Sequence, residues 1–361
     1  MFWLVAAFLS NLSFAFQDLV AYKLSALQNL NAVAINTSVH LSYCILFLLV
    51  LYFSSFINKS YVSDHVNNFK ALLSSSKILL FLYALLSMLA NSLLYYAYAY
   101  GKKLDNLNPG IASTLSNCSL IISVLLPYFV YNSQLKFINI LGIIIYLVSV
   151  YFLSKIDQSD SKKQQPIGPK STEKGAGSVL DDKLLSNQNF TAKKKILKFS
   201  NQYYTWLLLC ILSALLYGVA GFTAFSIIKR NKKVLNNVLT FMFFALEALI
   251  GLCIFIFFEL DDSKQLQKGL FNNHNKDLKN LLFNFSNLVY VIAASILNGL
   301  GVITLYAGYK NAPNPGFTDA ISNLYTTTQA ILNWIIYGTS LNKIQGLGVF
   351  LASISITLLN L

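Results

Sequence analysis

The chain has 361 residues, of which 55% are apolar and 11% are charged, and its formal net charge is +13. Soluble globular proteins carry about 25% charged residues, so this composition excludes a soluble globular protein and predicts an all-α integral membrane protein. The positive charge comes almost entirely from lysines in the predicted loops, where it suits membrane topology and contact with the lipid bilayer rather than binding of nucleic acid.

Ten apolar runs are long enough, or nearly so, to cross about 30 Å of hydrocarbon as helices. In chain order they are residues 2–23, 31–57, 77–100, 109–131, 136–154, 203–228, 236–259, 286–308, 313–337 and 343–361. No basic residue precedes the apolar core of the first run, so we expect a membrane span there and not a cleaved secretory signal. The four cysteines lie inside spans without a CxxC pair, so we expect neither a zinc site nor a disulfide framework.

The second half of the chain repeats the first half. A shift of 206 residues aligns residues 108–155 with 314–361 without a gap, and twelve of the 48 aligned pairs are identical. Weaker matches at nearby shifts carry the repeat through the other spans. Polar pairs that recur are Ser10 with Ser213, Asn31 with Asn236, Ser116 with Ser322, and Asn117 with Asn323.

Each repeat unit contains five spans. Because five is odd, a second unit that starts where the first ends must enter the membrane from the opposite side. The sequence therefore predicts ten transmembrane helices in two inverted five-helix repeats, at residues 1–155 and 203–361, a construction typical of secondary transporters. Residues 156–202 are rich in Ser, Lys, Gln, Asp and Gly, and we expect a disordered basic linker there.

An Asn-Pro-Gly tripeptide opens the fourth span at residues 108–110 and the ninth span at residues 314–316. We expect each Asn side chain to cap a helix, each Pro to occupy the first helical position, and each Gly to allow close approach of a neighbouring helix. The tripeptide is therefore interpreted as a helix start in both halves and not as a binding motif.

Short motifs carry a resemblance to a known family. They are Leu216-Tyr217-Gly218 in the sixth span, Pro109-Gly110 through Asn117, Pro315-Gly316 through Asn323, and Gln345-Gly346-Leu347-Gly348 at the start of the last span. With its two inverted halves, the chain resembles the drug/metabolite transporter superfamily, EamA type. The resemblance implies a ten-span permease with both termini in the cytoplasm, whereas 18 of the 27 basic residues lie on the linker side of the membrane.

The chain also departs from the pattern of that family. Phe14-Ala15 stands where an aromatic-Gly pair is expected in the first half, and Ser133-Gln134 and Thr339-Ser340 replace the acidic residue common before the fifth and tenth spans. No function that depends on that acid is carried over to this chain.

Polar groups inside hydrocarbon are costly, so those within spans are candidates for a transport site. Glu247 lies near the middle of the seventh span, and we expect it to carry a coupling proton; the alternative is a protonated Glu that bonds to a neighbouring helix. His40 lies at a similar depth in the second span and is a candidate for substrate contact, proton relay or packing. Gln17 and Asp18 are candidates for substrate contact, the alternative for Asp18 being an interfacial pair with Lys23.

Two further polar faces are related by the repeat. The ninth span carries Asp319, Asn323 and Gln329, and the fourth span carries Ser116 and Asn117. We expect these residues to line a central substrate cavity between the halves, although the place of Asp319 near a helix N-terminus offers a purely structural reason for its charge. The dense tyrosines between positions 95 and 100 are interpreted mainly as an interfacial belt.

These observations predict a secondary transporter of small polar organic metabolites that works by alternating access, driven by a proton gradient or by exchange because no nucleotide-binding loop is present. The alternatives are a nucleotide-sugar-type carrier and a non-transporting membrane scaffold. No paired carboxylates, metal-ligand cluster or Ser-His arrangement recurs on facing spans, so we expect no enzymatic activity, cofactor or metal site. The expected partners are a small-molecule substrate and the lipid bilayer. The sequence leaves open a homodimer, the orientation and which membrane holds the protein.

Overall fold

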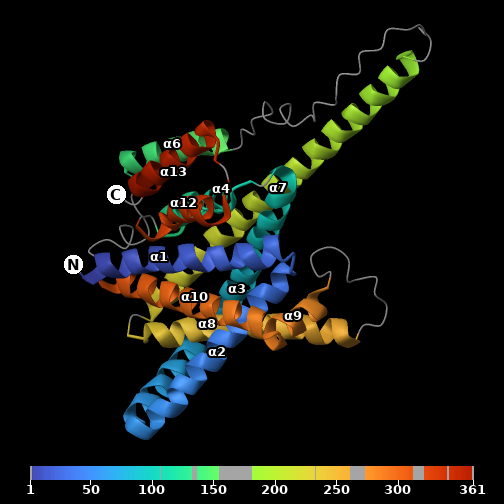
Figure 1. The fold of residues 1–361 in the computed structure, drawn as a ribbon. Coiled ribbons are helices and arrows are strands. Elements are labelled where there is room, and N and C mark those ends of the chain that lie inside the picture. Colours follow the sequence, from blue (N-terminus) through green and yellow to red (C-terminus); the bar gives the residue numbers. More distant parts are fainter. Residues whose placement is uncertain are drawn as a thin grey trace.

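The computed structural model describes residues 2–105, 107–131, 136–153, 181–231, 233–260, 273–311, 321–339 and 341–359. All regular elements in these ranges are helices, which confirms the predicted all-α class (Figure 1). In chain order they are α1 (Phe2–Tyr22), the π-helix η1 (Lys23–Leu27), α2 (Ala32–Ile57), α3 (Lys59–Asp105), α4 (Pro109–Ser116), α5 (Ser119–Tyr131), α6 (Phe137–Leu153), α7 (Asp181–Arg230), α8 (Asn236–Leu260), α9 (His274–Phe283), α10 (Phe285–Asn311), α12 (Tyr325–Tyr337) and α13 (Lys343–Leu359).

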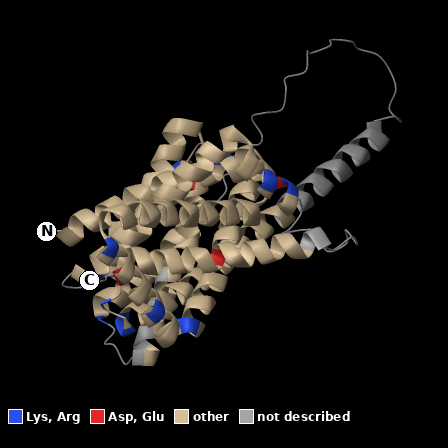
Figure 2. Ribbon diagram, turned by 90° about the horizontal axis from the view of Figure 1, so that it is seen from below, with Lys and Arg blue, Asp and Glu red and all other residues tan. Residues whose placement is uncertain are grey.

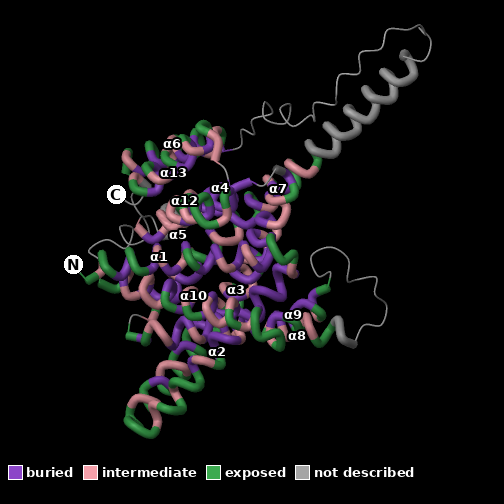
Figure 3. Tube along the Cα trace, in the orientation of Figure 1, coloured by how far each residue is buried: buried purple, intermediate pink, exposed green. Residues whose placement is uncertain are grey.

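Six helical stretches in the described residues are long and apolar enough to cross a membrane, so the protein is a multi-pass integral membrane protein. They are Phe2–Leu27, Ala32–Ile57, Lys59–Leu104, Asn201–Arg230, Asn236–Phe257 and Phe285–Asn311. Large apolar side chains such as Leu48, Phe53 and Ile296 are exposed. Exposed residues lie along the outer sides of the helices (Figure 3), while Lys and Arg gather near helix ends (Figure 2). An exposed apolar surface of this extent suits contact with lipid.

Two predicted spans are broken helices. Residues 109–131 form α4 and α5, which are separated at Asn117 and Cys118. In the predicted ninth span, residues 313–320 lie outside the described ranges, and the helix that follows is interrupted at Leu324 before α12 begins. Asn side chains compete for the backbone hydrogen bonds of a helix, which favours breaks next to Asn117 and Asn323. The described residues therefore contain six rather than ten uninterrupted long spans.

The main helix contacts join the first half of the chain to the second half. Helix α1 packs against α10, α3 against α7, and α2 against α8. Helix α4 packs against α12, and α6 against α13, which form a pair at one edge of the molecule (Figure 1).

The first Asn-Pro-Gly segment starts α4 as predicted. Asn108 Oδ1 accepts a hydrogen bond from the Gly110 amide at 2.8 Å, and Pro109 lies in the first turn. A Cβ atom at Gly110 would lie 2.5 Å from Cα of Ala330, so the glycine lets α12 pack directly on α4. Asn108 Nδ2 also donates to the Ala330 carbonyl at 3.0 Å. The second segment, at 314–316, lies outside the described residues.

Two segments between the predicted spans are helical. Helix α7 begins at Asp181, so residues 181–202 of the expected linker belong to a helix, while residues 156–180 lie outside the described ranges. Neither Pro nor Gly occurs between residues 181 and 202, which suits a helix. Residues 59–76 extend α3 up to a kink at Ser76, whose Oγ accepts a hydrogen bond from Asn231 Nδ2 at 3.0 Å.

Candidate functional site

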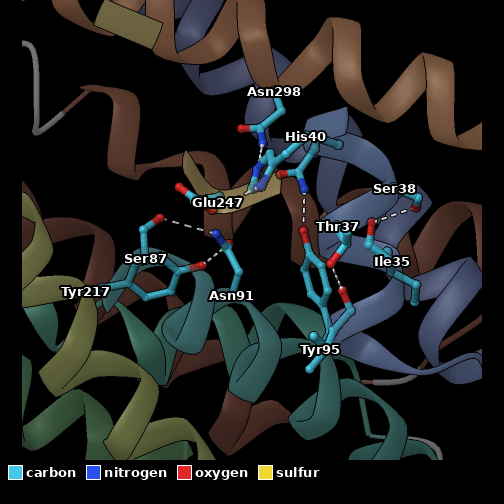
Figure 4. A network of polar contacts seen from close by, with 12 residues as sticks. Ile35, Thr37, Ser38, His40, Ser87, Asn91, Tyr95, Tyr217, Glu247 and Asn298 are labelled. Atoms are coloured by element: carbon cyan, nitrogen blue, oxygen red, sulfur yellow. Dashed lines mark hydrogen bonds and ion pairs between the residues drawn. The ribbon is translucent and has the colours of Figure 1, made fainter. Parts of the chain in front are cut away.

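Two predicted candidates meet at the contact between α2 and α8. His40 Nδ1 lies 3.0 Å from Glu247 Oε2, and both side chains are 1% exposed (Figure 4). Nδ2 of Asn298 on α10 lies 3.3 Å from His40 Nε2, and the Phe244 ring stacks on the imidazole with its centroid 4.4 Å away. The structure therefore brings into contact two residues that the sequence indicates only one at a time.

The two side chains lie within ion-pair distance, but His40 Nδ1 and both carboxylate oxygens of Glu247 have no hydrogen-bond partner among the described residues. Burial of an isolated charge is costly, so the pair is stable when both groups are neutral or when imidazolium faces carboxylate. Both forms hold the same number of protons and have zero net charge.

A polar face of α3 lies beside this pair. Ser87, Asn91, Tyr95 and Tyr98 follow one another at intervals of four, four and three residues, which places them on one side of the helix. The Tyr217 hydroxyl on α7 donates to Asn91 Oδ1, and Asn91 Nδ2 donates to Ser87 Oγ at 3.5 Å (Figure 4). Tyr95 and Tyr98 are 2% and 1% exposed, so the interpretation as an interfacial belt is wrong for these two residues.

Asp18 on α1 forms the centre of a second polar cluster. Its side chain is 4% exposed, and Oδ2 accepts hydrogen bonds from the Tyr98 hydroxyl at 2.8 Å and from Ser113 Oγ at 3.3 Å. Nε2 of Gln329 on α12 donates to the Tyr98 oxygen at 3.1 Å. The structure thus links two predicted substrate contacts, Asp18 and Gln329, through a tyrosine that the sequence did not single out.

The neighbours of Asp18 on its own helix have other partners. Gln17 Nε2 donates to the Tyr95 hydroxyl at 2.6 Å, which attaches a third predicted contact to the same face of α3. Lys23 Nζ donates to the Tyr290 hydroxyl and lies 4.1 Å from the centroid of that ring. The interfacial pair of Lys23 with Asp18 is therefore not formed.

The predicted contacts Ser116 and Asn117 both engage the second half of the chain. Ser116 Oγ lies 2.8 Å from Ser213 Oγ on α7, and Ser213 donates to the Ala90 carbonyl on α3 at 2.9 Å. Asn117 Nδ2 donates to the Asn323 carbonyl at 3.3 Å. Ser116 thus bonds to another helix, and Asn117 and Asn323 lie next to each other.

A second pair of serine hydroxyl groups makes the same kind of contact between helices. Ser10 Oγ on α1 lies 2.8 Å from Ser322 Oγ and donates to the Gly301 carbonyl on α10 at 2.9 Å. The side chain of Asn11 donates to the Ile321 carbonyl at 3.0 Å. Asp319, also predicted to line the cavity, lies outside the described residues.

Long apolar helices that enclose paired and clustered polar side chains define a polytopic membrane protein whose interior holds ionisable groups. Residues 1–155 match the model of the EamA-like transporter family, which confirms the resemblance to drug/metabolite transporters over this part of the chain. This part of the chain is therefore similar to a family of membrane transporters. No curated protein matches the chain.

Proposed function

We propose that the protein is a secondary transporter of small polar organic metabolites, which works by alternating access between inverted halves at residues 1–155 and 203–361. The two pairs of hydroxyl groups carry this proposal. The repeat aligns Ser10 with Ser213 and Ser116 with Ser322, so the Ser10–Ser322 contact is the counterpart of the Ser213–Ser116 contact, and both distances are 2.8 Å. A pseudo-two-fold axis between the halves requires contacts in such counterpart pairs.

The pairing of the helices supports the same symmetry. Exchange of the halves converts the α1–α10 contact into the α7–α3 contact, and both pairs are packed together. The same exchange maps the α2–α8 and α6–α13 pairs onto themselves. Asn117 and Asn323, which are 206 residues apart and equivalent in the repeat, touch each other as residues next to the axis must. The family match ends at residue 155, the predicted end of the first half.

The His40–Glu247 pair is the proposed site of proton coupling. It joins α2 to α8, which are equivalent helices of the two halves, so a change in its charge acts on their relative position. A coupling ion drives alternating access only if its binding differs between the two states. Rearrangement of α2 against α8 would separate or join the pair and thereby change its affinity for a proton.

Uptake by the full chain in lipid vesicles tests this function, with a panel of amino acids, nucleosides and other small metabolites and with or without an imposed pH gradient. We expect Glu247→Gln to lose the acceleration by the gradient and to keep solute exchange, because glutamine neither gains nor loses a proton at neutral pH. Asp64→Asn, at an exposed carboxylate of α3, is the matched control. A full response to the gradient in Glu247→Gln rules out the coupling role. If the wild-type protein moves no solute with or without the pH gradient, the result favours the alternative of a non-transporting membrane scaffold.

A further inference from the structure

The cluster around Asp18 combines unused hydrogen-bond acceptors with a carboxylate that has no cationic partner among the described residues. We propose that this cluster is the substrate site and that it binds an organic ammonium ion, such as the protonated amine of a small metabolite. The proposal rests on the transport function proposed above and adds the chemical class of the substrate.

Three hydroxyl and carboxyl groups of the cluster lie within hydrogen-bond distance of one another. The Tyr98 hydroxyl lies 2.8 Å from Asp18 Oδ2, and its oxygen accepts from Gln329 Nε2. Ser113 Oγ lies 3.3 Å from the same carboxylate oxygen and 2.5 Å from the Tyr98 oxygen, where either hydroxyl can donate. Asp18 Oδ1, by contrast, receives no hydrogen bond from the described residues.

Two amide oxygens on α12 add to the unused acceptors. Oε1 of Gln329 has no hydrogen-bond partner among the described residues, although the side chain is 0% exposed. The same holds for Oδ1 of Asn333, one turn further along, whose Nδ2 donates to the Gln329 carbonyl at 2.9 Å. A buried acceptor without a partner is unfavourable, and a ligand that brings several N–H groups satisfies it.

The charge balance also favours a cation. Among the described residues, the buried Asp, Glu and His side chains are three carboxylates and three histidines, and no Lys or Arg side chain is buried with them. Glu247 faces His40, whereas Asp18 has only neutral donors. An ionised carboxylate without a counter-charge is costly in a membrane interior, and a ligand ammonium supplies that charge. A nucleotide sugar, by contrast, brings negative phosphates and meets no buried cation here.

Aromatic rings near the carboxylate suit an organic cation better than a metal ion. The Tyr98 hydroxyl contacts Asp18, and the rings of Tyr95 and Tyr98 are stacked with their centroids 6.0 Å apart. Ring faces attract ammonium groups, most strongly when water is excluded. No group of three or more His, Cys, Asp or Glu side chains in the described residues is placed to hold a metal ion.

The site also spans the two halves of the chain. Asp18 belongs to α1 and Gln329 to α12, and Tyr98 connects them. An ammonium ion held between Asp18 Oδ1 and Gln329 Oε1 stabilises the state in which α1 and α12 are close. Such a difference in affinity between states is what a transported substrate needs.

The test uses matched probes on the purified full chain in detergent micelles. Benzylammonium and phenethylammonium are the cations, the corresponding alcohols are the neutral controls, and benzoate is the anion. A rise of the melting temperature that saturates with probe concentration measures binding. We expect saturable stabilisation by the two ammonium salts and none by the alcohols or benzoate at equal concentration.

Two variants locate the site. We expect Asp18→Asn to weaken benzylammonium binding at least about tenfold, because a charge-assisted hydrogen bond becomes a neutral one, and Asp64→Asn to bind as the wild type does. Gln329→Leu keeps the charge and removes one acceptor, so we expect a loss of about threefold to tenfold. This variant carries the test if Asp18→Asn does not fold.

The outcomes separate this inference from the transport function. Absence of ammonium binding, equal stabilisation by ammonium and alcohol, or unchanged affinity in both variants overturns the ammonium site. Saturable ammonium binding without movement of any solute in vesicles retains the site and removes transport. Movement of neutral or anionic solutes, with the same KM in Asp18→Asn as in the wild type, retains the transport function and removes the ammonium site.

Discussion

Acidification is expected to weaken the fold through one histidine outside the membrane-spanning helices. His274 is the first residue of α9 and is 1% exposed, and burial lowers the pKa of its ring from 6.5 to about 4. Because the pKa is lower in the folded state, the unfolded chain binds the proton more tightly. The stability that depends on the neutral ring is complete above about pH 6.5 and is lost as the pH falls toward about 4.

The size of this effect follows from the two pKa values. The linkage relation gives a loss of about 2 kcal/mol at pH 5 relative to pH 7.5, and about 3 kcal/mol when the loss is complete. For a large domain this corresponds to a fall of roughly 4 °C in the melting temperature at pH 5. His274→Leu replaces the ring by an apolar side chain of similar size, which stays neutral in both states.

Thermal unfolding of the wild type and His274→Leu in one detergent, at pH 7.5 and pH 5, measures this contribution. Between pH 7.5 and pH 5, we expect the melting temperature of the wild type to fall further than that of His274→Leu. The difference between the two falls is the part due to His274. Burial raises the pKa of Asp277, one turn along α9, but that carboxyl is present in both proteins and its effect largely cancels. Equal falls in the two proteins would refute the reasoning.

Two predictions concern packing between the halves. Gly110→Ala places a Cβ 2.5 Å from Cα of Ala330, so we expect a loss of about 1–3 kcal/mol and a lower melting temperature. Gly346→Ala, whose Cβ meets nothing within 4 Å, is its control, and equal melting temperatures for the two variants contradict the close packing of α4 on α12. Ser10→Ala and Ser213→Ala remove counterpart hydroxyl contacts, and we expect each to cost about 1 kcal/mol in denaturant unfolding. An effect in only one of these two argues against the symmetry.

The features that depend on nearby residues could be predicted from the sequence. The cap at Asn108 follows from side chains within two positions of the helix start, and the structure has it as expected. Glu247 and His40 were identifiable because ionisable groups stand out in apolar runs. Their contact was not predictable, because the repeat aligns His40 with residue 245 and says nothing about how the side chains of α2 and α8 meet.

Tyr98 was missed for a different reason. Tyrosine is equally suited to a membrane interface and to a buried site with a hydrogen-bond partner, so its abundance in α3 did not distinguish the two. The stripe formed with Asn91 and Tyr95 at helical spacing was the available signal. The helix breaks next to Asn117 and Asn323 were also missed, because a polar residue within an apolar run predicts a polar face as readily as an interruption.

Residues beside a symmetry axis behave differently from the others when a molecule changes state. In the proposed cycle the halves exchange conformations, so the Ser10–Ser322 contact takes the geometry of the Ser213–Ser116 contact, and the reverse. Asn117 and Asn323 are each other's equivalents, and the exchange only reverses which of them donates. Their contact would then be a pivot about which the halves turn. Because both serine contacts are 2.8 Å long, the exchange leaves them alike, as expected of a state that is closed on both sides.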